Sequence, residues 1–302
     1  MNVINKYKSE NKLCLANLFK NIICIENNAN KYYITTELPE IINKRKFNDL
    51  IDFIDFIINT LHDELNKKQI KEQINYSDFK PNPTDPQEML NHFINQFINN
   101  NKSIISDLFF GTFSNKITCL NCQTQKYNYE IFSNLIFPLD EVNEYKKSKL
   151  MLKNNLDIVT INDCFEFNQR IQLLSGEDAI TCNICKTNSS NNYSSFIYTA
   201  PEILILIFEV NEKSNIKLEY NLDLNLYNNI IRRETGYKFN LIGVVSKVKE
   251  SGVNECFIAY YRSQKDNCWY KYDNDIISKN IDFKKEIIDS GIPSILFYEK
   301  SA

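Results

Sequence analysis

The chain has 302 residues, 43% of them hydrophobic, which is enough to bury the core of one large domain or of two ordinary ones. Its 35 Lys and Arg residues nearly balance its 38 Asp and Glu residues, for a formal net charge of -3. This balance argues against a general attraction to nucleic acid or to an anionic membrane, so we expect neither as a partner and look instead for a local recognition site.

The N-terminal sequence MNVINKYKSENK is polar, and no run reaches 18 apolar residues. Neither a signal peptide nor a membrane span is therefore expected, and we expect an intracellular protein of the cytoplasm, the nucleus or both. In such a compartment nine cysteines are expected to be reduced or bound to metal rather than paired in disulfides.

The first hundred residues have helical periodicity, with apolar residues three and four apart at 15–25 and again at 47–68. A third amphipathic helix is expected within 78–97, with Thr84 or Asp85 as its N-cap and Pro86 in its first turn.

From Ile117 the pattern changes to short segments rich in β-branched and aromatic residues, separated by polar turns. Among them only residues 160–174 read as a helix. Strands are expected at 115–122, 126–139, 194–200, 202–210, 238–246, 255–262, 268–273 and 294–300. A helical lobe followed by a largely antiparallel β region is an α+β layout.

Two C-x-x-C pairs form the most specific local motif in the chain: Cys119 with Cys122, and Cys182 with Cys185. Each pair places two thiolates on one side of an ion, and two pairs complete a tetrahedral zinc site with no open position for water. We therefore expect one structural Zn²⁺ whose binding contributes folding energy. The alternative is that the four cysteines pack as small hydrophobic residues.

The order of these features resembles the ubiquitin-specific protease (ubiquitin carboxyl-terminal hydrolase) family, which has a papain-like catalytic domain shaped as a hand. DPQEML resembles the family's QDAQEFL box, SIISDLFFGTFSNKITCLNC its approach to the first zinc knuckle, and LLSGEDAITCNIC the second knuckle. FNLIGVVS, FIAYYR, CWYKYDND and SILFYEK resemble the closing palm strands.

The resemblance implies one catalytic-type domain over 1–302, with a helical thumb at 1–110, and antiparallel fingers and palm with a zinc ribbon at 111–300. It covers most of the chain and is strongest from Asp85 onward. The implied activity is cleavage after the C-terminal glycine of ubiquitin by a cysteine, a histidine and an Asp or Asn.

The residues that the resemblance assigns to catalysis are Cys14, Cys256 and Asp273. Cys14 in NKLCLANLF is a partial match to the nucleophile box, with Ser9 where the family usually has an oxyanion-donating Asn; a buried cysteine on an amphipathic helix is the alternative. ECFIAYYR aligns with the histidine motif but holds Cys256 at the histidine position. WYKYDND places Asp273 where the orienting acid belongs.

The chain has only two histidines, His62 and His92, and both lie in the helical half. Recruitment of His92 as the base is an alternative, since a residue four positions after Glu88 shares its helical face.

Asp85 and Glu88 match the family positions that meet the arginines of the ubiquitin tail, while a helix-capping role is the simpler alternative. The run DLIDFIDFIINTLHDELN also resembles the same box, although DPQE retains its D-x-Q-E pattern.

Three functions follow as hypotheses. The first is a domain that binds ubiquitin or ubiquitinated partners, alone or within a host complex, and whose deubiquitinase activity is lost or weak because Cys256 replaces the histidine. The second is an active thiol-dependent deubiquitinase with an altered base. The third, a zinc-ribbon protein that binds nucleic acid, is disfavoured by the balanced charge.

Overall fold

The structure, a computed structural model, describes residues 47, 49–66, 80–98, 101–150, 157–211, 214–249, 255–273, 276–288 and 292–301. The chain separates into two compact units. The first comprises Met1–Ile74 with Asn99–Asp107, and the second comprises Asn75–Ile98 with Leu108–Ala302. The expectation of a single domain over 1–302 stays a prediction.

Helix α4 (Leu50–Leu65) is the main described element of the first unit. It begins at Asp49, whose carboxylate accepts a hydrogen bond from the Asp52 N–H, as expected of an N-cap. His62 near its end is buried, and its Nδ1 lies 2.7 Å from the hydroxyl oxygen of Ser103, the residue before α6 (Ile104–Phe109). The helix expected at 15–25 lies outside the described residues.

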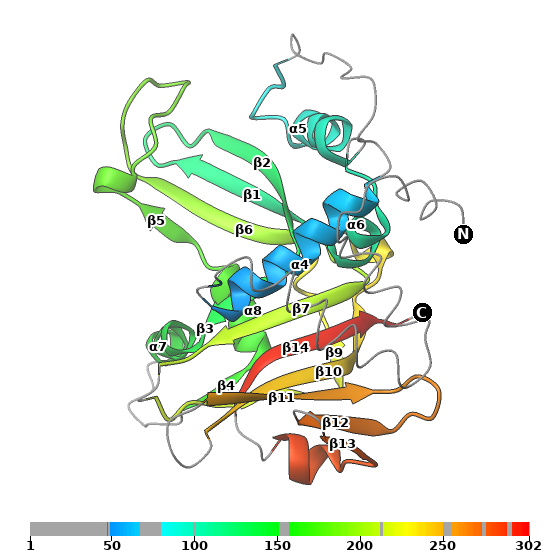
Figure 1. Ribbon diagram of the computed structural model, residues 1–302. Helices are drawn as coiled ribbons and strands as arrows, with labels where there is room; N and C mark the ends of the chain where they lie inside the picture. The colour runs from blue at the N-terminus through cyan, green and yellow to red at the C-terminus, as the bar shows by residue number, and fades with distance from the viewer. Residues whose placement is uncertain are drawn as a thin grey trace. The chain divides into compact units, whose positions relative to one another are not determined.

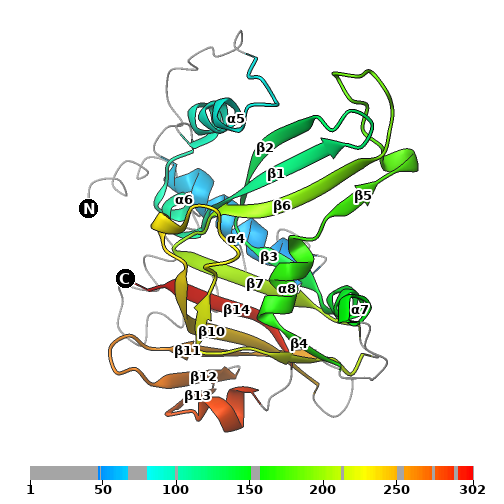
Figure 2. The same ribbon diagram turned by 180° about the vertical axis from the view of Figure 1, so that it is seen from behind.

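A four-stranded antiparallel sheet in the second unit has the order β2-β1-β6-β5. Its strands are β1 (Gly111–Cys119), β2 (Gln125–Phe132), β6 (Asn191–Thr199) and β5 (Gln172–Leu174). Helix α5 (Pro86–Phe93) and the π-helical turn η3 (Ile94–Ile98) continue from one another, and α5 lies beside β2 in both views (Figures 1 and 2). The sequence therefore placed this third helix correctly, and Asp85 rather than Thr84 is its N-cap.

An eight-stranded sheet forms the other part of the second unit, in the order β13-β12-β11-β10-β14-β7-β3 with β9 beside β10. Neighbouring strands are antiparallel except for β3 and β7. The strands are β3 (Leu135–Pro138), β7 (Ile203–Glu209), β9 (Asp223–Asn225), β10 (Lys238–Lys249), β11 (Glu255–Arg262), β12 (Trp269–Asp273), β13 (Ile276–Lys279) and β14 (Pro293–Lys300). A small parallel pair joins β4 (Ile158–Thr160) to β8 (Lys217–Glu219), and short turns lie at η4 (Gly176–Asp178), η5 (Arg233–Thr235) and η6 (Phe283–Ile287).

The hydrophobic core joins the eight-stranded sheet to α7 (Leu139–Leu150) and α8 (Ile161–Asn168). Phe137 of β3, Phe165 of α8 and Tyr298 of β14 are almost completely buried within it. Trp269 is also buried and stacks on Phe283 with ring centroids 5.5 Å apart.

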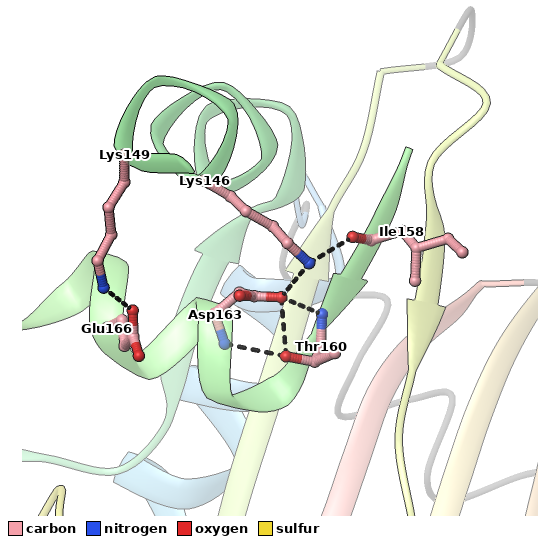
Figure 3. Close-up of polar contacts among 6 residues, drawn as sticks. All are labelled: Lys146, Lys149, Ile158, Thr160, Asp163 and Glu166. Atoms are coloured by element: carbon pink, nitrogen blue, oxygen red, sulfur yellow. Dashed lines mark hydrogen bonds and ion pairs between the residues drawn. The ribbon is translucent and has the colours of Figure 1, made fainter. Parts of the chain in front are cut away.

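Polar contacts hold α8 against α7 (Figure 3). Thr160 and Asp163 form a capping box at the start of α8, and the Lys146 ammonium of α7 lies 2.8 Å from Asp163 Oδ2. Lys149 also pairs with Glu166 on the next turn of α8. Helix α7, which the sequence patterns missed, buries Leu139 and Val142 in the core but has only a narrow apolar face.

Several element boundaries differ from the sequence predictions, and the segment expected as one strand at 126–139 forms β2 and β3, which belong to different sheets. The β region begins at Gly111 rather than Ile117, because β1 pairs with strands on both sides and its two faces are both largely covered, so the alternation of period two is lost. The helix expected at 160–174 ends at Asn168, and residues 172–174 form β5 against β6. Pairing with a distant strand overrides the local helical pattern there.

Candidate active site and metal centre

The two C-x-x-C pairs fold into turns of the same geometry. In the first, the Cys119 N–H donates to Thr124 O and the Gln123 N–H donates to Cys119 O. In the second, the Cys182 N–H donates to Thr187 O and the Lys186 N–H donates to Cys182 O. The residue after each second cysteine, Gln123 or Lys186, has a φ of 59°. Each turn therefore aims two sulfurs in one direction.

The four sulfur atoms converge and lie within 4.8 Å of one another. Sγ of Cys119 lies 3.8 Å from that of Cys185, and Sγ of Cys122 lies 3.6 Å from that of Cys182. Four thiolates at a Zn–S distance of about 2.3 Å would be about 3.8 Å apart, so the spacing fits a tetrahedral site. The structure brings all four predicted ligands together, and they are placed to bind a metal ion.

Hydroxyl groups next to the sulfurs were not anticipated from the sequence. Thr124 Oγ1 lies 3.1 Å from Cys122 Sγ, and Thr187 Oγ1 lies 3.0 Å from Cys185 Sγ. Both threonines belong to a repeated C-x-x-C-x-T pattern, which is the signal that could have identified them. The Thr187 hydroxyl, with Asn121, lowers the pKa of Cys185 to about 5. A hydrogen bond from Ser189 likewise lowers the pKa of Cys119, and the thiolate is the form that binds metal.

The histidine-equivalent position and the orienting acid lie on neighbouring strands. Cys256 is in β11, where its backbone pairs with Val248 of β10. The register of β11 and β12 pairs Ala259 with Tyr272, and its continuation places Asp273 opposite Ile258, two positions from Cys256. Asp273 also lies within 3.2 Å of the Lys271 ammonium, and both side chains are about 30% exposed.

The remaining candidates are Cys14, Ser9 and His92. Cys14 and Ser9 lie outside the described residues, so the nucleophile assignment stays a prediction. His92 lies on α5 and lines a cavity against β2 of the four-stranded sheet, whereas Asp273 ends β12 of the eight-stranded sheet.

The two candidate tail-binding acids stand at the start of α5. Asp85 Oδ1 accepts hydrogen bonds from the N–H groups of Gln87 and Glu88 at 2.9 and 3.2 Å. The capping role is thus observed, and since Asp85 is exposed, this role leaves the carboxylate accessible to a ligand.

The family model described as "Ubiquitin carboxyl-terminal hydrolase" matches residues 2–298. The chain belongs to this family. Ubiquitin carboxyl-terminal hydrolase 2 of Gallus gallus is 22% identical to it over 259 residues, which are 83% of this chain and 68% of that protein. Ubiquitin carboxyl-terminal hydrolase 9 of Saccharomyces cerevisiae is 24% identical over 291 residues, which are 88% of this chain and 34% of that protein.

Two solved structures of the SAGA deubiquitinating module contain chains similar to this member of the family. One, from yeast, has a TM-score of 0.65 at 18% identity and covers 96% of this chain and 58% of that chain. The other, whose module is bound to monoubiquitin, has a TM-score of 0.64 at 17% identity and covers 96% and 59%. The expected α+β fold of the ubiquitin-specific proteases, with its thumb, fingers and palm, is confirmed.

In the terms of this family, the four-stranded sheet with the cysteine turns is the fingers, and the eight-stranded sheet is the palm. The chain spans between 34% and 68% of the two curated relatives' lengths. Among the described helices, none is both long enough and apolar enough to cross a membrane.

Proposed function

We propose that this chain binds ubiquitin or a ubiquitinated partner and has little or no deubiquitinase activity. The observation that carries the proposal is Cys256 in β11, beside the strand that ends at Asp273. The resemblance of ECFIAYYR to the family's histidine motif assigns this position to the catalytic histidine. Ubiquitin itself enters the proposal through the family and through the monoubiquitin-bound relative.

The chemical reason concerns proton transfer. An unperturbed thiol titrates near pH 8.5 and is a poor proton shuttle beside a second thiol, so the loss of the imidazole costs about two to four orders of magnitude in rate. A missing oxyanion donor at Ser9 would cost roughly another hundredfold.

Replacement of Cys256 by histidine tests this proposal directly. Wild-type protein should cleave a fluorogenic ubiquitin substrate very slowly or not at all, and Cys256→His should raise the rate, with a further gain from Ser9→Asn. Cys14→Ala in the rescued protein should abolish the activity. Cys268→His, which changes a free cysteine in the turn before β12, is the matched control and should rescue nothing.

Robust wild-type turnover that persists in Cys256→Ala would instead support the second hypothesis, an active deubiquitinase with an altered base. A ubiquitin probe that traps thiolates would then label Cys14. If a folded Cys256→His, Ser9→Asn protein showed no gain, Cys14 would not be the equivalent of the nucleophile.

We also propose that Asp85 and Glu88 bind the arginines of the ubiquitin tail. The start of α4 offers a matched comparison, because Asp49 and Asp52 have the same spacing at a helix N-terminus and lie in the run that also resembles the family box. Replacing Asp85 by Asn and Glu88 by Gln should weaken ubiquitin binding by about tenfold or more. If only the Asp49→Asn, Asp52→Asn protein loses affinity, the tail is bound at α4 instead.

The metal of the four-cysteine site is proposed to be one structural Zn²⁺. The donor set supports this, since four thiolates suit zinc and leave no coordination position for substrate or water. Cys119, Cys122, Cys182 and Cys185 would hold the ion and tie the two turns of the fingers together.

A further inference from the structure

Strand β2 forms one edge of the finger sheet, and on its outer side some main-chain groups have no partner among the described residues. Three hydrogen bonds show which residues of β2 direct their N–H and C=O groups toward β1 and which direct them outward. They are Cys119 N to Thr124 O, Leu120 N to Ser190 O, and Tyr127 N to Pro83 O. With the register of β1 and β2, they turn the main-chain groups of Tyr127, Tyr129 and Ile131 away from β1.

Among the described residues, a main-chain partner is seen only for the first of these outward positions. The Tyr127 N–H donates to Pro83 O at 2.8 Å, just before α5 begins. Within the part of the chain that the structure describes, the main-chain groups of Tyr129 and Ile131 make no hydrogen bond outside their sheet. An edge with free N–H and C=O groups is a template for another extended chain.

A cavity of about 720 Å³ adjoins this free edge. Met89, Phe93 and Phe97 line it from α5 and η3, and Tyr129 lines it from β2, with the Phe93 and Tyr129 ring centroids 6.2 Å apart. Asn128, Glu130 and Ile131 of β2 line it as well. Its volume is in the range that accommodates a ligand side chain or a small molecule.

The carboxylate nearest the free positions is that of Glu130, while Lys126 lies on the same face of β2 beside Tyr127, whose outward N–H is already bonded to Pro83. Glu130 is exposed; it accepts a hydrogen bond from the Asn128 amide, and no Lys or Arg of the described chain forms an ion pair with it. A strand paired with β2 would point alternate side chains toward the aromatic cavity and toward Glu130. The complementary sequence therefore alternates large apolar residues with basic ones.

We propose that the α5–β2 edge is a docking site for an extended segment of a partner protein, in which apolar side chains that enter the cavity alternate with a Lys or Arg that faces Glu130. Main-chain hydrogen bonds to Tyr129 and Ile131 supply affinity, and the cavity and Glu130 supply specificity. The site does not depend on the proposed binding of ubiquitin.

The test uses the full chain and a synthetic peptide that alternates Leu and Lys over nine residues. Amide hydrogen exchange at Tyr129 and Ile131 should slow by about tenfold or more at saturating peptide, while exchange in β11 stays unchanged. The same peptide with N-methyl groups on alternate amides, which keeps the side chains but removes the strand edge, should give no protection. A Leu–Glu peptide should bind more weakly than the Leu–Lys peptide.

Two variants separate the main-chain and charge contributions. Ile131→Pro removes an outward N–H without removing a ladder bond to β1, and it should weaken binding by about fivefold, whereas Ile131→Val keeps the N–H and should not. Glu130→Lys should weaken binding of the Leu–Lys peptide by about fivefold and improve binding of the Leu–Glu peptide.

Three results would overturn the proposal. They are equal binding of the N-methylated peptide, preference for the acidic peptide, and protection of Tyr129 that depends on protein concentration in the absence of peptide. The last result would mean that the edge pairs with a second copy of this chain. A protein that binds the Leu–Lys peptide but not ubiquitin would uphold this site and refute the proposed function.

Discussion

At the scale of single residues, Asp163 combines two roles at one carboxylate. Its Oδ2 accepts hydrogen bonds from the Thr160 N–H and hydroxyl, both at 2.8 Å, and pairs with Lys146. The ammonium of Lys146 also donates to Ile158 O at 2.9 Å, so the end of β4, the start of α8 and the middle of α7 meet there (Figure 3).

Asp163→Ala should lower the free energy of unfolding by about 1–3 kcal/mol, because it removes a helix cap and leaves the largely buried Lys146 ammonium without a carboxylate. Glu166→Ala on the same helix is the matched control. Its pair with Lys149 is about half exposed, so we expect a change below about 1 kcal/mol in denaturant unfolding. Equal losses in the two variants would show that the capping box adds nothing.

The pH dependence of this difference follows from the ionisation of Asp163. Burial opposes that ionisation, but Lys146 and Thr160 outweigh it and hold the pKa of Asp163 below its ordinary value. The carboxylate therefore stabilises the fold above the unfolded pKa of about 3.9, and this contribution is lost as the pH falls through the lower, folded value. The gap between wild type and Asp163→Ala should thus be constant near neutral pH and shrink below about pH 4.

At the scale of elements, the two cysteine turns close the ends of strands that have little core of their own. Cys119 ends β1, and Cys182 lies between η4 and β6, in a segment that is mostly exposed. The Leu120 N–H donates to Ser190 O, so the two turns touch through the main chain as well as through the sulfurs. A metal ion bound by both turns would stabilise this contact.

Cys122→Ser should lower the zinc content below one ion per chain and speed amide hydrogen exchange around both turns. The amides of β10 and β14 should keep their protection from exchange. Elemental analysis and hydrogen exchange measure the two effects. Cys268→Ser, which changes a cysteine outside the cluster, should alter neither. A metal-free wild-type protein with fully protected turns would rule out a structural metal.

At the scale of the whole molecule, the near-balance of positive and negative residues argues against the hypothesis that this protein binds nucleic acid. With a net charge of -3, the chain should not be retained on immobilised DNA or RNA at about 150 mM salt. Retention that falls linearly with the logarithm of the salt concentration would contradict this and revive the zinc-ribbon alternative. A protein with its surface lysines changed to arginine keeps the charge and is a suitable control.

The sequence alone was sufficient for features that depend on local chemistry. The strand at 255–262 and the helix that begins after Asp85 follow from alternation and from a capping residue followed by proline. The spacing within each C-x-x-C pair picked out the four cysteines whose sulfurs converge, and the order of the motifs identified the family. Each of these signals lies within a few residues of the chain.

Only the tertiary structure decided what depends on pairing between distant segments. Residues 172–174 form a strand because they pair with β6. The register of β11 with β12 determines which residue of β11 lies opposite Asp273. The free edge of β2 likewise follows from which side of that strand β1 occupies. Local propensity is worth tenths of a kcal/mol to about 1 kcal/mol per residue, so the burial and hydrogen bonds gained by long-range pairing override it.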